Sequence, residues 1–236
     1  MQMKKLIIAL LSFVALCCSV NVNAASKVYA VVTLKNGKEY ANVEIKPPKG
    51  WDKKVDIKVD GQKMALAADS IAQIVFWHVK SPYNQQMICY REYALFNRET
   101  GEYQADNKSL RKKGLFSKQW FALHHPAEYV DVWITFAYIK AGDESVVFSG
   151  SLSSPYFFHK KSDRLFVHIP YARLRPGLTR EWLRAFFADD EVLAETLEDK
   201  SELYDRGRKS AMRNGTVFTP FKYEDIADSY VAGRKK

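Results

Sequence analysis

The chain has 236 residues, 47% of them hydrophobic and 27% charged, with a formal net charge of +9. This is an ordinary globular composition, large enough for one large domain or two small ones, and it shows no internal repeat or low-complexity segment. The positive net charge favours solubility and non-specific attraction. By itself it neither excludes nor identifies a partner.

The first predicted element is a secretory signal peptide over residues 1–24. Lys4 and Lys5 form its basic region, an apolar run follows from Leu6 to Cys18, and Val22-Asn23-Ala24 is a small-residue cleavage pattern. The apolar run is shorter than the ~20 residues that a transmembrane helix needs. We therefore expect an exported, periplasmic or secreted chain that begins near Ala25 and has no transmembrane segment.

A lipoprotein is the alternative, with Cys17 or Cys18 as the acylated residue. Leu16 and Cys17 precede these two positions, where such sites usually have a small residue, so we favour the simple signal peptide. Cleavage then leaves Cys89 as the only cysteine, and no internal disulfide can form. Because Cys89 lies in an apolar, strand-like run, we interpret it as a buried small hydrophobe and not as a nucleophile.

Residues 25–82 predict a small antiparallel β-barrel or sandwich module. Asn36-Gly37 and Asp60-Gly61 are typical of two-residue hairpin turns, and the apolar residues of Lys54–Asp60 alternate with charged ones, which indicates one wet face. Pro82 suggests the end of the module. The expected strands are KVYAVVTLK, KEYANVEIK, KVDIKV, QKMALA and SIAQIVFW.

Residues 83–236 predict a second antiparallel sheet followed by helices packed on it. Its expected strands are MICYREYALFN, QWFALH, YVDVWITFAYIK, SVVFSG, YFFHK and RLFVHIPY, with a polar, basic loop between Gln104 and Lys118. Strands that precede helices, without alternation, indicate an α+β fold that is mostly β.

Three helices are expected after Pro176. Thr179 can cap the first of them, whose apolar face holds Trp182, Leu183, Phe186 and Phe187. A short second helix presents Val192, Leu193, Thr196 and Leu197. The third begins at Thr219-Pro220, presents Phe221, Ile226, Ala227 and Tyr230, and ends at Gly233.

The stretch WFALHHPAEYVDVW, from Trp120 to Trp133, is the sharpest candidate for chemistry. Its two histidines suggest a metal ion or proton transfer, but adjacent side chains on an extended strand point to opposite faces, and a zinc site needs three or four convergent ligands. Pro126 suits a turn better than a central strand. We therefore predict a turn between two strands over His124 to Glu128, with no metal site.

A ligand-binding face is the second hypothesis for the same stretch. Tyr129, Asp131 and Trp133 alternate on one face of the predicted strand, which could place a carboxylate within an aromatic surface that binds sugars or other planar ligands. Packing within the sheet is the alternative for such aromatic residues.

Local signatures of common enzymes are absent from the sequence. There is no Gly-x-Ser-x-Gly, His-Glu-x-x-His, phosphate loop or dinucleotide fingerprint, so we predict no catalytic residue, metal or cofactor. Acidic residues Asp189-Asp190-Glu191 are interpreted as helix capping. An exported chain meets little nucleic acid, which leaves an anionic envelope surface, a polysaccharide or another envelope protein as the expected partner.

The signal peptide, the VTLKNGKEY hairpin and the segment WLRAFFADDEVLAETLEDK together resemble exported, uncharacterised β-rich proteins of the Bacteroidetes type. Those proteins often end in a similar aromatic and acidic helical segment, while this chain departs in its longer basic tail. The resemblance implies an envelope location and carries over no catalytic residue.

The sequence therefore favours a non-enzymatic binding or scaffolding protein of the cell envelope. The alternative is a secreted hydrolase that acts on a glycan or peptide, with Glu128 and Asp131 as the acid–base candidates.

Overall fold

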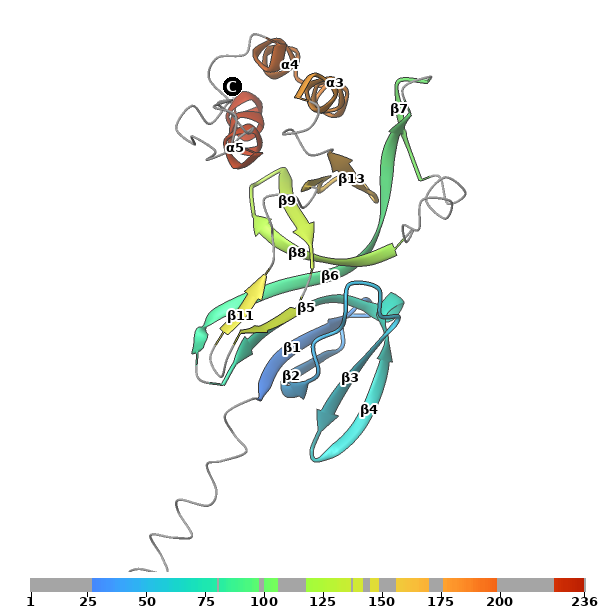
Figure 1. The fold of residues 1–236 in the computed structure, drawn as a ribbon, viewed down its shortest axis with the longest axis vertical. Helices are drawn as coiled ribbons and strands as arrows, with labels where there is room; N and C mark the ends of the chain where they lie inside the picture. Colours follow the sequence, from blue (N-terminus) through green and yellow to red (C-terminus); the bar gives the residue numbers. More distant parts are fainter. Residues whose placement is uncertain are drawn as a thin grey trace, which may run out of the picture. The chain divides into compact units, whose positions relative to one another are not determined.

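A computed structural model gives the structure of the chain. It describes residues 27–79, 81–97, 100–105, 118–136, 138–141, 145–148, 156–169, 176–198 and 223–235. The predicted signal peptide, the Gln104–Lys118 loop apart from its ends, and the Thr219-Pro220 helix start lie outside these residues. The structure is mostly β, with its helices at the C-terminal end, so the predicted α+β class is confirmed (Figure 1).

The described residues divide into two compact units. The first lies within Met1–Pro48, Lys53–Met87 and Tyr138–Val147, and the second within Lys49–Asp52, Ile88–Ala137 and Phe148–Lys236. The chain passes from one unit to the other inside the long strand β6 (Ser81–Asn97), between Met87 and Ile88. Pro82 lies near the start of this strand, a position that tolerates proline.

The first unit contains the five strands predicted for the N-terminal module. They are β1 (Val28–Leu34), β2 (Glu39–Ile45), β3 (Lys54–Val59), β4 (Gln62–Ala67) and β5 (Ile71–His78). A 3-10 turn, η2 (Ala68–Ser70), separates the last two, and the strand order is β5-β1-β2-β3-β4. The core of the unit consists of alternate apolar residues, among them Val28, Ala30, Val32, Val43, Ile45, Val55, Ile57, Ile71, Ile74 and Phe76.

Its two hairpin turns differ from each other. Asp60 and Gly61 both have positive φ angles of 48° and 82°, as a two-residue turn with a matching twist requires. At the other turn only Gly37 has a positive φ, and its N–H donates to the carbonyl of Leu34. The prediction of a two-residue Asn36-Gly37 turn is therefore wrong, because Lys35 and Asn36 occupy the turn and Gly37 follows as a bulge.

The second unit contains a closed five-stranded barrel. Its order is β6, β8 (Lys118–His125), β9 (Val130–Thr135), β12 (Tyr156–Lys160) and β13 (Phe166–Ile169), and β13 pairs back to β6 through Phe166↔Tyr93 and Val167↔Ala94. This last pairing is parallel, whereas an antiparallel sheet was expected. The reason is geometric: with neighbours antiparallel around a ring of five, the strands that close it run in the same direction.

Three further described strands are not part of this barrel, and two of them, β10 (Tyr138–Ala141) and β11 (Ser145–Phe148), fall in the first unit except for the last residue of β11. β7 (Glu102–Gln104) pairs with the end of β6. The predicted strand YVDVWITFAYIK is divided into β9 and β10, and β10 pairs with β11 in a separate two-stranded sheet.

Strands β9, β12 and β13 alternate between residues that face the aromatic interior of the barrel and residues that face the helices. Inside, the rings of Phe121, Phe157 and Phe166 are in contact, with centroids 4.6 Å apart for Phe121–Phe157 and 4.9 Å for Phe121–Phe166. Outside, one core cluster joins the strands to the helices, and its strand members are Val130, Val132, Phe158, Val167 and Ile169.

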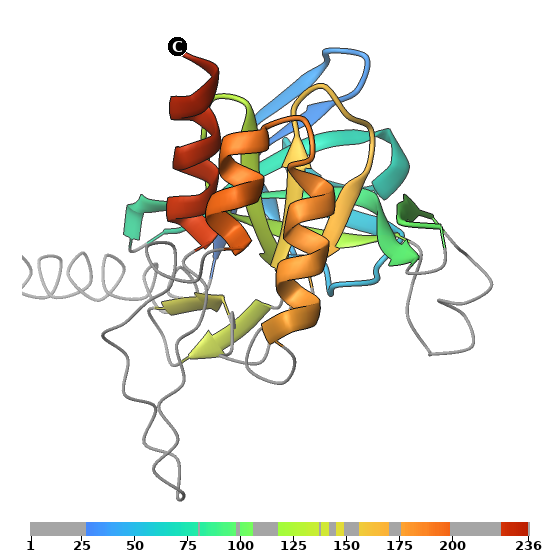
Figure 2. The ribbon, with the colours of Figure 1, turned by 90° about the horizontal axis from the view of Figure 1, so that it is seen from above.

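The helices are α3 (Pro176–Phe186), α4 (Glu191–Glu198) and α5 (Tyr223–Arg234), and they lie side by side against the barrel (Figure 2). The predicted apolar residues of α3 and α5 that fall within the described chain are buried in the core cluster: Trp182, Leu183, Phe186, Phe187, Ile226, Ala227 and Tyr230. In α4, Leu193 and Leu197 are buried, but Val192 is 76% exposed, so its predicted place on the apolar face is wrong. In the described residues no helix is long and apolar enough to cross a membrane.

Of two helix starts predicted from the sequence, the start of α3 differs from the prediction and the cap of α4 is confirmed. α3 begins at Pro176, where a proline loses no helical hydrogen bond, so Thr179 lies inside the helix and does not cap it. Asp190 does cap α4, because its Oδ1 accepts the N–H of Leu193 at 3.0 Å. The capping interpretation therefore holds for Asp190, while Asp189 forms ion pairs described below.

Candidate functional site

The sequence-predicted residues Tyr129, Asp131 and Trp133 lie at the start of β9 and within it, in the second unit. Asp131 and Trp133 are 9% and 5% exposed, whereas Tyr129 is 37% exposed. The ring of Trp133 packs on Phe166 with centroids 5.1 Å apart. These three residues do not form an exposed aromatic surface, because Asp131 and Trp133 face the filled interior of the barrel.

Asp131 holds the turn that precedes it. Its Oδ1 accepts the N–H of Ala127 at 3.2 Å and lies 3.5 Å from the Nζ of Lys161. Its strand partner across the ladder is His159, whose Nε2 lies 3.0 Å from the carbonyl oxygen of Asp163. Burial lowers the pKa of His159, which favours the neutral form of its ring.

The predicted connection between two antiparallel strands is confirmed, but its predicted bounds, His124 to Glu128, are shifted: β8 ends at His125 and β9 starts at Val130, so both histidines belong to β8. The direction expected for the histidines is wrong, however. A register shift between Leu123 and His125 inserts one extra residue, so that both His124 and His125 reach helix α5.

On α5 the two histidines meet two carboxylates one helical turn apart. His124 Nε2 contacts Glu224 Oε1, and His125 Nε2 lies 2.9 Å from Asp228 Oδ1. The contact with His124 is the main reason why the pKa of Glu224 is lowered to about 2. The pair of histidines that suggested a metal site therefore attaches helix α5 to the end of strand β8.

Other charged residues of the second unit also attach the helices to the barrel strands. Glu128 lies 2.7 Å from Lys235, just after α5, and this contact lowers the pKa of the Glu128 carboxyl. Lys160 donates to the carbonyl of Phe186 at 2.7 Å and to Asp189 at 2.6 Å. Asp189 also contacts Tyr230 and Arg234 of α5. In this way β12, the end of α3 and helix α5 are joined through one lysine and one carboxylate.

Cys89 lies inside the barrel opposite Phe121 and is 3% exposed, and burial raises its thiol pKa to about 12. A thiol with this pKa stays protonated, so the interpretation of Cys89 as a buried small hydrophobe is confirmed. Within the residues that the structure describes, no three or more His, Cys, Asp and Glu side chains are grouped to hold a metal ion.

An open groove of about 530 Å³ lies on the first unit, over strands β2, β3 and β4. It is lined by Glu44, Ile45, Lys46, Asp56, Ile57, Lys58, Lys63, Met64 and Ala65. The strand register explains why these residues meet: Glu44 lies opposite Lys58 and Lys58 opposite Lys63, while Asp56 lies opposite Ala65. The charged residues alternate with Ile45 and Ile57, which are buried in the core of the unit.

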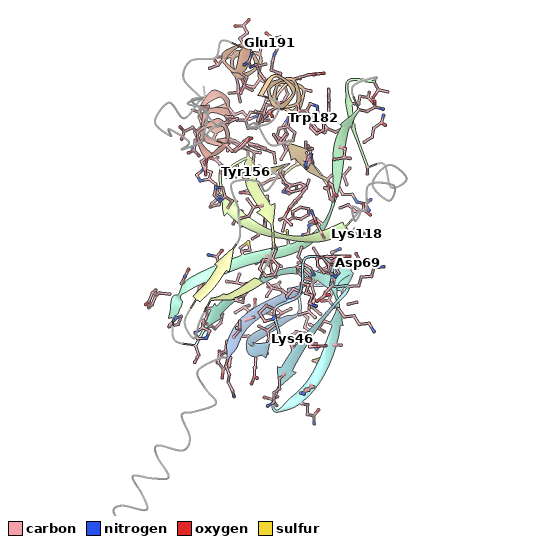
Figure 3. All side chains as sticks on the ribbon, viewed as in Figure 1. Lys46, Asp69, Lys118, Tyr156, Trp182 and Glu191 are labelled. Carbon is pink, nitrogen blue, oxygen red and sulfur yellow. The ribbon has the colours of Figure 1, made fainter. Side chains whose placement is uncertain are left out.

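The electrostatic balance of this groove is positive. Glu44 forms an ion pair with Lys27 at 3.4 Å, which offsets one of the two acidic residues of the lining. Lys46, Lys58 and Lys63 are exposed, and in the described part of the chain none of the three makes an ion pair. Lys46 is labelled in Figure 3, where the side chains of this unit are drawn as sticks.

Sequence reasoning missed this groove. The alternation Lys54, Asp56, Lys58, Asp60 did indicate a wet face on one strand. The groove also needs residues from β2 and β4, and their lateral order and register are set by the folded sheet. The two hairpin turns were the available signal, because consecutive hairpins make consecutive strands neighbours.

Comparison with protein-family models, with curated proteins and with solved structures finds no significant match to this chain.

Proposed function

We propose that the protein is an exported, non-enzymatic binding or scaffolding protein of the cell envelope, and that it binds an anionic partner in the groove over β2, β3 and β4. The observation that carries the proposal is this groove of about 530 Å³ with three exposed lysines. Lysine ammonium groups on flexible stems attract anionic groups without demanding one fixed geometry. Such a surface suits an anionic envelope polymer or an acidic segment of another envelope protein.

The contacts of the two acid–base candidates in the second unit favour a binding protein over a hydrolase. A general acid of a glycosidase needs a raised pKa, but the pKa of Glu128 is lowered by its contact with Lys235. Asp131 is nearly buried and holds a turn and a lysine. Both acid–base candidates are therefore used to stabilise the fold.

The test is binding of two anionic probes, polygalacturonate and poly-glutamate, to the chain without residues 1–24, with neutral dextran as the control polymer. The triple variant Lys46→Gln, Lys58→Gln, Lys63→Gln should weaken binding about tenfold, since each exposed charge contributes about 0.5 kcal/mol. The matched control changes the same number of exposed lysines outside the groove: Lys35→Gln, Lys53→Gln and Lys54→Gln. Equal losses in the two triple variants would show that only net charge matters, and would reject the groove.

A further inference from the structure

We infer that the ligand of the groove is an extended polypeptide segment carrying acidic side chains, which adds to strand β4 as a further strand. This inference rests on the proposed function and specifies the partner.

Strand β4 lies at the edge of its sheet. Among the described strands the order of the first unit ends at β4, and β3 is its only partner there. Four of its residues in a row, Gln62 to Ala65, are exposed. An exposed sheet edge presents backbone N–H and C=O groups that another extended chain can pair with.

The register identifies which groups point outward. The two-residue turn Asp60-Gly61 makes Val59 and Gln62 a hydrogen-bonded pair, so the next bonded pair is Ile57 and Met64. The N–H and C=O of Lys63 and Ala65 therefore point away from β3. The backbone hydrogen bonds of β3 follow the same alternation. The carbonyl of Asp56, which lies opposite Ala65, points to β2 and accepts the N–H of Lys46 at 3.1 Å.

The backbone groups of β4 that are available for pairing end before the carbonyl of Ala67. The carbonyl of Ala67 already accepts the hydroxyl of Ser70 at 2.7 Å, so pairing at this edge involves Lys63 and Ala65. The register of β3 and β4 is continuous from Lys54↔Ala67 to Val59↔Gln62. β4 also contains no proline, so neither a bulge nor a missing donor blocks the edge.

Charge selects the incoming chain. The side chains of Lys63 and Lys58 are cross-strand neighbours beside the edge, and Lys46 lines the same groove. A second copy of this protein would bring its own Lys63 and Lys58 against these lysines, and like charges on neighbouring strands repel. A strand with acidic residues at every second position would instead place them on the face that carries the lysines.

The probe is an acetylated and amidated heptapeptide of alternating Glu and Val, and the readout is amide hydrogen exchange. Binding should protect the amides of Lys63 and Ala65, which point to the added strand. It should leave the amide of Met64 unchanged, because that amide already bonds to β3. Protection of Met64 alone, or of none of the three in the presence of bound peptide, would overturn strand addition.

A substitution gives an independent test. Ala65→Pro removes an outward N–H without removing a bond to β3, so the fold should tolerate it while the affinity for the peptide falls at least tenfold. Ala65→Ser keeps the N–H and is the matched control, and thermal unfolding of both variants checks the fold. Peptide binding that is unchanged by Ala65→Pro would overturn the inference, whether or not the exchange experiment has been done.

Measuring the binding of polygalacturonate and of the heptapeptide side by side separates this inference from the proposed function. Binding of polygalacturonate that depends on the groove lysines, with no binding of the peptide, would reject strand addition and keep the groove as a polysaccharide site. Absence of binding by both probes would reject the groove itself.

Discussion

Two strand lysines, one in each unit, have opposite surroundings. Lys160 of β12 is 14% exposed at its side chain, donates to Phe186 and Asp189, and lies 4.9 Å from the Phe186 ring centroid. Lys58 of β3 is exposed and borders a groove. A charge count therefore cannot separate a structural lysine from a binding one, whereas the number of fixed partners of each lysine can.

The largest effect is expected in the barrel interior. Phe121 is fully buried among Tyr93, Phe157 and Phe166, so Phe121→Ala should lower the free energy of unfolding of the second unit by about 3–5 kcal/mol. Met64→Ala in the groove is the control and should cost less than about 1 kcal/mol, because Met64 is 37% exposed. Urea unfolding followed by far-UV circular dichroism measures both. Similar losses would contradict the contrast between a filled barrel and an open groove.

Lys160→Met comes next. It leaves the Asp189 carboxylate without one of its donors and the carbonyl of Phe186 without its lysine, so a loss of about 2–3 kcal/mol is expected. Lys58→Met, the same change in the groove, should stay within about 0.5 kcal/mol. Chemical denaturation of the two variants side by side provides the measurement. A loss below about 1 kcal/mol for Lys160→Met would contradict the structural role.

A smaller effect is expected at the β3–β4 turn of the first unit. Gly61 has a φ of 82°, and a Cβ atom added to it would meet no other atom within 4 Å. Gly61→Ala therefore costs only the backbone conformation, about 1 kcal/mol. Gly61→Asn is the matched control, since asparagine tolerates this conformation better. Thermal unfolding of both variants measures the difference, and equal stability of Gly61→Ala and the parent would show that the turn relaxes.

The smallest effect is expected from acid. The pKa of Glu224 is lowered to about 2 in the folded protein, below its ordinary 4.5, mainly by His124. Its contribution to stability is therefore fully present above about pH 4.5 and is lost as the pH falls toward about 2. Solvent screens the pair, because the Glu224 side chain is 40% exposed.

The measurement is the thermal midpoint between about pH 5 and pH 2, the window of this titration. Glu224→Gln should reduce its acid dependence, and Glu195→Gln on the exposed side of α4 should not. An identical acid profile for Glu224→Gln and the parent would contradict the contribution of this pair.

Much of the fold could be predicted because its local signals are strong. Asp60-Gly61 specifies its turn, alternation specifies the strands, and the apolar residues of α3 and α5 specify their buried faces. The Asn36-Gly37 turn and the exposed Val192 were predicted wrongly, because turn geometry and the exact rotation of a helix depend on tertiary contacts.

The candidate site was less accessible to sequence reasoning. A single inserted residue before His125 directs both histidines to helix α5. No local sequence pattern predicts such a bulge. The partners of Glu128 and Lys160 lie far along the chain, at Lys235 and Asp189. The groove depends on the lateral order of three strands, which hairpin turns favour but do not fix.

The closing strand of the barrel also sets a condition on the order of folding. β6 can pair with β8 soon after both have formed, but its other edge meets Phe166 and Val167 only after the intervening strands β9 and β12 are in place. Such long-range pairing is slow, because loop entropy is lost before the contact forms. A chain that ends before Phe166 would leave Tyr93 and Ala94 of β6 without their partner strand and would keep the aromatic interior of the sheet open. We therefore expect such truncated chains to aggregate, and closure of the barrel to be a late step in folding.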